Sequence, residues 1–172
     1  MQKKYLLSQT ISITAIASVS PLGNDSETIW NNFNNPNPLF QNQFIDHKNT
    51  WVGELDADSK AVVNVLRQSD SKYNSLDNSV LFAMLASRKA IAKAGWSKQD
   101  VFGINIGSSR GATDLFENHF KEYMSTGSAP TLTSPTTTLG NISSWVAHDL
   151  QSSGPEISHS ITCSTALHAV LN

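Results

Sequence analysis

Cys163 is the only cysteine in the chain, and a thiol can act as a nucleophile once its proton is removed. An extended run rich in β-branched residues, 157–162, leads into it, and small residues able to start a helix follow it. A cysteine at such a junction lies beside the free backbone N–H groups and the positive dipole end of the helix. That environment stabilises a thiolate, so the sequence indicates a nucleophile at Cys163.

A second interpretation of Cys163 is structural, because a lone cysteine often packs as a small buried hydrophobic residue. Nucleophilic chemistry needs a nearby base, and neither neighbouring histidine makes a convincing one. His168 follows by five positions, which on a helix turning ~100° per residue directs it away from Cys163. His159 precedes Cys163 by four positions on the expected strand. Residues 161–165, ITCST, also lack the GxCxG pattern of a hydrolase nucleophile elbow.

A glycine-rich turn, GSSRG at residues 107–111, lies between an expected strand and an expected helix. Strand, glycine-rich turn and helix is the order found in phosphate-binding loops. The turn matches neither GxGxxG nor GxxxxGK[ST], so we expect a tight turn with close backbone packing. A small nucleotide- or phosphate-binding α/β module stays open as an alternative function for the chain.

Composition argues against several classes of function. Among 172 residues 15% are charged and the net charge is −2, so no basic block indicates nucleic acid binding. The five histidines show no HxxxH or HExxH spacing, and we expect no metal site and no bound cofactor. A single cysteine forms no internal disulfide, so we expect a cytoplasmic location. No run is long and apolar enough to span a bilayer, so we expect no membrane partner.

The N-terminal residues allow two interpretations. Lys3 and Lys4 followed by apolar residues mimic a signal peptide, with residues 15–17 as its cleavage site. Serine, threonine and glutamine interrupt that apolar region, and β-branched residues partly alternate with polar ones beyond it. We therefore expect a strand at residues 11–19, followed by a turn at residues 20–24.

The remaining elements alternate in an order typical of an α/β fold. The strongest helix prediction covers residues 76–94, with Ser75 as its N-cap and Gly95 just past its end. Ser, Thr and Pro predict a loop at residues 128–138. The other expected helices are 25–33, 56–66, 113–125 and 139–150, with strands at 51–55 and 101–106 and an irregular segment at 39–50. This order predicts a mainly parallel sheet covered by helices.

Residues 162–170, TCSTALHAV, resemble the active-site segment of the β-ketoacyl-acyl-carrier-protein synthases, condensing enzymes with the thiolase-like fold. Other segments resemble that family in the same order, namely residues 13–24, 76–95, 102–111, 127–141 and 154–155. The resemblance covers nearly all of residues 1–172 except 34–74, which we expect to be an irregular insertion. The chain therefore resembles the N-terminal half of such an enzyme.

The resemblance implies an acyltransferase activity centred on Cys163. Its thiol would accept an acyl group from the phosphopantetheine thioester of an acyl carrier protein, and its own N–H would be one oxyanion donor. The acyl enzyme would then condense with a malonyl thioester and release carbon dioxide, in fatty acid or polyketide synthesis. The implied partners are the acyl carrier protein and a second thiolase-fold subunit, in a homodimer or a heterodimer.

The chain departs from the family pattern near the thiol. Ala166 stands where the family usually has glycine, and Thr162 where it commonly has alanine. Arg110 occupies a position where many members carry an apolar residue near the acyl pocket, so we expect a shorter or more polar pocket. Residues 134–141 are rich in threonine where members often have aromatic residues.

The family's two catalytic histidines, its lysine and its second oxyanion donor lie in a C-terminal half beyond Asn172. We therefore expect that this chain alone does not complete the condensation, and that it exposes the face on which that half packs. A non-catalytic partner subunit of the same fold is the other alternative. The presence of Cys163 argues against it, because such partners tend to lack the nucleophile.

Overall fold

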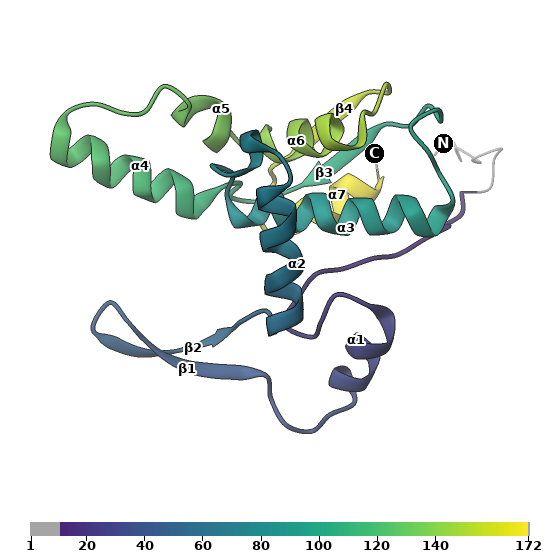
Figure 1. The fold of residues 1–172 in the computed structure, drawn as a ribbon, viewed down its shortest axis with the longest axis horizontal. Coiled ribbons are helices and arrows are strands. Elements are labelled where there is room, and N and C mark those ends of the chain that lie inside the picture. The colour runs from purple at the N-terminus through teal and green to yellow at the C-terminus, as the bar shows by residue number, and fades with distance from the viewer. Residues whose placement is uncertain (1–10, 172) are drawn as a thin grey trace, which may run out of the picture.

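Helix α3 (Asn78–Ala94) is the centre of the structure, a computed structural model that describes residues 11–171. Its side chains Val80, Leu81 and Met84 are fully buried. They join one hydrophobic core with side chains of α2 (Ala57–Gln68) and α6 (Asn141–Leu150), both of which contact α3. In Figure 1, α2 crosses one end of α3 and α6 is drawn above it. The apolar side chains of α3 therefore form the interior of the structure.

A two-stranded parallel sheet packs against α6 and contributes Ile104 to the same hydrophobic core. Strands β3 (Ile104–Gly107) and β4 (Glu156–His159) pair in register from Ile104 opposite Glu156 to Gly107 opposite His159. Ser143 of α6 hydrogen-bonds Glu156 and Ser158 on one face of this sheet. Because side chains alternate between the faces of a strand, His159 points to the opposite face, where α7 (Thr165–Leu171) contacts both strands. The expected α/β arrangement is confirmed, with a smaller parallel sheet than the strand pattern suggested.

The strand expected at residues 11–19 is wrong for the described part of the chain. This segment is extended and lies along α3, where Lys93 Nζ donates to the Ile16 carbonyl at 3.2 Å. Ile11 and Ile13 are each 80% exposed, and no strand pairs with the segment among residues 11–171. Alternation alone makes no strand, because a strand needs an edge to supply its hydrogen bonds. The signal-peptide interpretation rests mainly on residues 1–10, which lie outside the described residues.

The first helix and the turn before it form as the sequence predicted. Ser20 and Gly23 exchange backbone hydrogen bonds at 3.1 and 2.9 Å, and Gly23 takes φ 124°. Helix α1 (Ser26–Phe33) follows, and its N-cap Asp25 accepts hydrogen bonds from the backbone N–H groups of the first turn. Those bonds lower the pKa of the Asp25 carboxyl.

Helices α3, α4 (Thr113–Thr126) and α6 also match their predictions closely, and one N-cap differs. Gly95 ends α3 at φ 73°, as expected, but Asp77 rather than Ser75 is its N-cap and accepts from the Ser79 N–H at 2.8 Å. Helix α4 ends at Gly127, also at φ 73°. Helix α6 begins at Asn141, two residues later than predicted.

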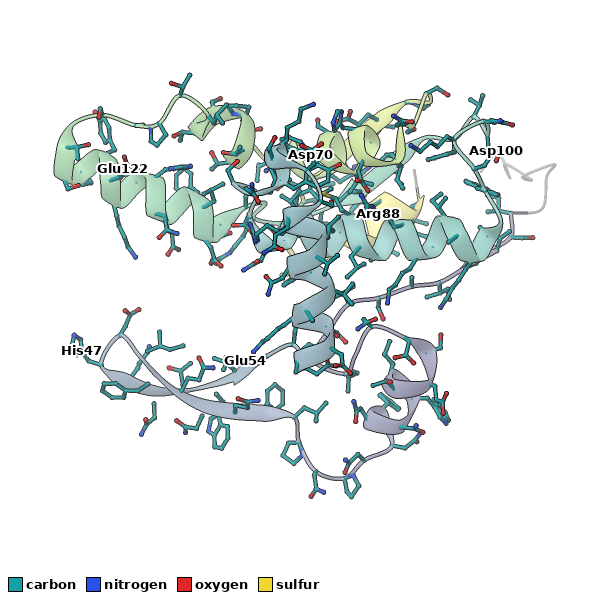
Figure 2. All side chains as sticks on the ribbon, viewed as in Figure 1. His47, Glu54, Asp70, Arg88, Asp100 and Glu122 are labelled. Carbon is teal, nitrogen blue, oxygen red and sulfur yellow. The ribbon has the colours of Figure 1, made fainter. Side chains whose placement is uncertain are left out.

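A β-hairpin replaces the irregular segment expected at residues 39–50, so that prediction is wrong. Strands β1 (Phe40–Ile45) and β2 (Lys48–Gly53) pair antiparallel, and β2 includes the start of the strand expected at 51–55. Asp46 and His47 form the two-residue loop with φ of 47° and 64°, as a type I′ turn requires. Figure 2 shows His47 at the tip of this hairpin, away from the other elements. That residues 34–74 are an insertion stays a prediction.

One short helix was not predicted. Residues 128–138 are not all loop, because α5 (Thr133–Thr137) lies within them.

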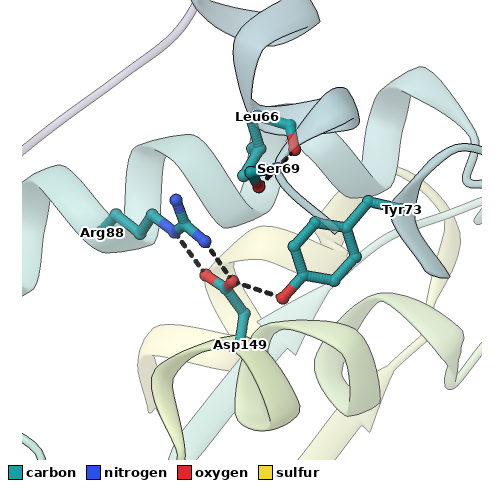
Figure 3. A network of polar contacts seen from close by, with 5 residues as sticks. All are labelled: Leu66, Ser69, Tyr73, Arg88 and Asp149. Atoms are coloured by element: carbon teal, nitrogen blue, oxygen red, sulfur yellow. Dashed lines mark hydrogen bonds and ion pairs between the residues drawn. The ribbon is translucent and has the colours of Figure 1, made fainter. Parts of the chain in front are cut away.

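One carboxylate joins three elements of the core. The 3-10 helix η1 (Ser71–Tyr73) follows α2 and brings Tyr73 to Asp149 of α6. The Asp149 carboxylate accepts the Tyr73 hydroxyl at 2.7 Å and is also paired with Arg88 of α3 at 2.5 Å. Figure 3 shows how this one carboxylate joins three elements.

Candidate active site

Cys163 lies in a 3-10 turn, η2 (Thr162–Ser164), that leads directly into α7. The strand before it, β4, ends at His159, earlier than the sequence suggested. The expected strand-to-helix junction is therefore confirmed, with a short turn between the two elements. The Cys163 side chain is exposed, so it does not pack as a small buried hydrophobic residue among the described residues. A reactant can approach the thiol from solvent in this structure.

Thr162, immediately before the thiol, has φ 47°. This left-handed region is disfavoured for a β-branched side chain, so the backbone is strained at this residue. The Thr162 carbonyl accepts two hydroxyl hydrogen bonds, from Ser109 at 2.7 Å and from Thr165 at 2.6 Å. The Thr165 hydroxyl also accepts the Ile161 N–H at 2.8 Å. Three polar contacts therefore determine the path of the chain on either side of Cys163.

The GSSRG turn at residues 107–111 packs directly against this junction. A Cβ on Gly107 would lie 2.5 Å from the Thr165 carbonyl oxygen, so only glycine lets β3 and α7 approach this closely. The Ser108 N–H donates to the His159 carbonyl, and the Gly111 N–H donates to the Ser108 hydroxyl. The predicted tight turn with close backbone packing is confirmed. A phosphate-binding loop is less favoured, because two of the turn's N–H groups are already used.

His159 and His168 are the histidines nearest to Cys163 in sequence, and neither was expected to act as its base. His159 ends β4, and its Nε2 is buried without a hydrogen-bond partner among the described residues. Strand alternation directs this side chain to the face of the sheet that α7 covers. His168 lies half-buried within α7.

Arg110 stands exposed in the same turn, next to the residue whose hydroxyl reaches Thr162. Sequence reasoning named Arg110 but missed Ser109, whose only signal was its membership of the turn. The contact joins residues 53 positions apart, so no local pattern could have identified it. A second hydrogen bond joins the same two segments, because the Ser160 hydroxyl donates to the Ser109 carbonyl at 3.3 Å.

Large apolar side chains are exposed around the junction. Their exposed fractions run from 41% to 80%, and the residues are Ile157, Ile161, Leu167, Val170 and Leu171. They belong to β4, to the junction and to α7, so they surround the thiol along the chain. Exposed apolar surface of this kind marks a region that packs against something else.

Other kinds of site are less well supported within residues 11–171. Nowhere in this part of the chain do three His, Cys, Asp or Glu side chains gather closely enough to hold a metal ion. None of the helices formed by these residues has the length and apolar character needed to cross a membrane.

Comparison with known proteins assigns the chain a family. A family model described as the N-terminal domain of β-ketoacyl synthases matches residues 8–172. A β-ketoacyl synthase from Burkholderia phymatum STM815 superposes with a TM-score of 0.72 at 19% identity, over 92% of this chain and 41% of that one. The ishigamide ketosynthase/chain length factor superposes with a TM-score of 0.66 at 13% identity, over 86% of this chain and 39% of that one. No curated protein matches the sequence. The chain thus spans about two fifths of the length of the solved structures it resembles.

Proposed function

Since the chain belongs to the β-ketoacyl synthase family through that family's N-terminal domain, we propose that it is the nucleophile-bearing portion of a β-ketoacyl-acyl-carrier-protein synthase. The observation that carries the proposal is the exposed Cys163 at the start of α7. The thiol lies within the matched residues and follows a strand of the parallel sheet, where an acyl thioester can reach it. The structural similarity to a β-ketoacyl synthase is consistent with this placement.

The first half of the reaction uses groups that this chain contains. The Cys163 thiol loses its proton, and its sulfur forms a bond to the carbonyl carbon of an acyl thioester carried on phosphopantetheine. The negative charge that develops on the carbonyl oxygen is stabilised by the Cys163 N–H at the helix start. The bond to the pantetheine sulfur then breaks, and that thiol leaves with a proton. The acyl group stays on Cys163 as a thioester.

The second half of the reaction needs groups that we place outside this chain. A malonyl thioester loses carbon dioxide, and the resulting carbanion attacks the acyl carbonyl, so that a carbon–carbon bond forms and the Cys163 thiolate leaves. The family's two histidines, its lysine and its second oxyanion donor would promote this step. Residues 1–172 alone are therefore expected to accept an acyl group without completing the condensation.

A second thiolase-fold subunit and an acyl carrier protein are the proposed partners. One of the structural neighbours is itself described as a ketosynthase/chain length factor, and this supports an assembly of two such subunits for this chain. The apolar side chains exposed on β4 and α7 support burial by other thiolase-fold surfaces. Homodimer and heterodimer are both compatible with that surface, and a cytoplasmic location stays a prediction.

The test is acylation of the full-length protein. The protein is incubated with acyl carrier protein bearing acyl groups of several lengths, and the peptide containing Cys163 is analysed by mass spectrometry. An acyl adduct on Cys163, absent from Cys163→Ala, supports the proposal. An unmodified Cys163 with every acyl donor contradicts it. If ATP or NAD then raises the melting temperature, the phosphate-binding alternative gains support instead.

A further inference from the structure

Thr162 is the only β-branched residue with positive φ among residues 11–171. The other non-glycine residues with positive φ in this part of the chain are Asp46 and His47 in the hairpin loop and Gln151 at the end of α6. Tight turns and helix ends favour positive φ, so those three need no special support. Thr162 lies neither in a hairpin loop nor at the C-terminal end of a helix, since it is the first residue of η2 beside the thiol. A strained residue persists only where its surroundings hold it.

Two hydroxyl groups hold the Thr162 carbonyl from different parts of the chain. Thr165 is local and 3% exposed, and its Oγ1 donates to that carbonyl at 2.6 Å. Ser109 comes from the GSSRG turn, and its Oγ donates to the same oxygen at 2.7 Å. Thr165 is three residues from Thr162, whereas Ser109 follows β3 and lies 53 positions away. Of the two hydroxyl contacts, the one from Ser109 therefore joins the Thr162 carbonyl to the turn after β3.

Ser109 is itself held in place. Its carbonyl accepts the Ser160 hydroxyl at 3.3 Å, and the turn around it is closed by the bond from the Gly111 N–H to the Ser108 hydroxyl. The side chain and the main chain of Ser109 thus both contact residues just before the thiol. This is the arrangement of a clamp between the turn and the Cys163 junction.

We propose that Ser109 is a positioning residue that keeps Thr162 in its strained conformation and thereby orients the Cys163 thiol, an inference that rests on the proposed function. Without the Ser109 hydroxyl, Thr162 relaxes toward negative φ. The chain then enters η2 in a different direction, and the thiol moves relative to the first N–H groups of α7. In this proposal Ser109 acts through Thr162, so substrate binding is expected to stay unchanged.

The test compares acyl transfer to Cys163 in four forms of the full-length protein: wild type, Ser109→Ala, Thr162→Gly, and the double variant. Ser109→Ala slows acylation by about tenfold with an unchanged KM for the acyl carrier protein, because small misplacements of reacting groups lower the rate. Thr162→Gly restores the rate in the double variant, because glycine adopts positive φ without a clamp. Ser125→Ala is the matched control, since it removes a similar bond, from Ser125 Oγ to the Glu122 carbonyl at 2.9 Å, far along α4.

Two results would overturn the inference: Ser109→Ala acylating at the wild-type rate, or the double variant remaining as slow as Ser109→Ala. Rescue by glycine separates positioning from a general loss of structure, which a second substitution would not repair. If wild-type Cys163 accepts no acyl group, the proposed function fails, but the clamp is still testable. Threonine-selective NMR then reports whether the Cα chemical shift of Thr162 moves in Ser109→Ala, and an unmoved shift excludes the clamp.

Discussion

The packing around α3 and the junction at Cys163 are built in opposite ways. Around α3, side chains such as Leu81 and Met84 are completely buried by other parts of the same chain. At the junction, Leu167 and Val170 are exposed, while hydroxyl groups and a close backbone contact determine the geometry. The first region therefore supplies its own stability. The second has a defined backbone but leaves its apolar surface to be covered by something else.

The largest expected effect is in the core around α3. Met84→Ala removes a fully buried side chain and should lower the free energy of unfolding of this chain by about 2–5 kcal/mol. Leu167→Ala, the matched change on α7, should cost at most about 0.5 kcal/mol because Leu167 is exposed. Urea denaturation measures both values. Equal costs would mean that the two regions do not differ as described.

A backbone clash should have the next largest effect, this time at the junction. Gly107→Ala puts a Cβ 2.5 Å from the Thr165 carbonyl oxygen, so α7 must shift, at a cost of about 1–3 kcal/mol. Acylation of Cys163 in the full-length protein should fall as well. Gly140→Ala is the control, because its Cβ would meet only the Ser158 hydroxyl, at an ordinary 3.9 Å. A fully active Gly107→Ala would contradict this view of the junction.

A smaller effect is expected at the carboxylate shared in the core. Tyr73→Phe removes the hydroxyl bonded to Asp149 and should cost about 1 kcal/mol near neutral pH. Burial, together with that bond, raises the pKa of Tyr73 from 10.0 to about 12. Because the folded state holds this proton more tightly, the stabilisation is complete below pH 10 and is lost as pH rises toward 12. Between pH 10 and 12 the melting temperature should therefore fall more steeply for wild type than for Tyr73→Phe. Parallel curves of melting temperature against pH would refute the bond between Tyr73 and Asp149 as the cause.

The smallest expected change is one of preference rather than stability. Arg110 is exposed in the turn beside the junction, and Arg110→Ile should leave the melting temperature unchanged. It should shift acylation of Cys163 toward longer acyl chains, because it removes a charge that we place near the acyl pocket. A competition assay between acyl carrier proteins that bear short and long acyl chains measures the shift. An unchanged preference would remove Arg110 from consideration.

Local signals in the sequence were enough to predict the longer helices and the place of the thiol, although α5 was missed. Asp25 caps α1 and Gly95 ends α3 because both act on backbone groups within a few residues. Cys163 could be placed before a helix for the same reason. These features depend on short-range geometry that residue types report directly.

Features that depend on distant partners were missed. The hairpin was not recognised because its loop, Asp46 and His47, lacks the usual glycine. Residues 11–19 alternate as a strand does, but no edge among the described residues receives them. The contact of Ser109 with Thr162 joins two turns that only the parallel pairing of β3 and β4 brings together. Each case needed the partner's position, which local pattern does not contain.

The close approach of Gly107 to Thr165 has a consequence for how this protein can vary. The contact is made with main-chain atoms of Thr165, so it depends on glycine at position 107 and not on the size of neighbouring side chains. Residues around it, such as Arg110, can be exchanged while the thiol stays where β3 and α7 place it. Under the proposed function, the preference for acyl chains and the placement of the Cys163 thiol would then vary independently.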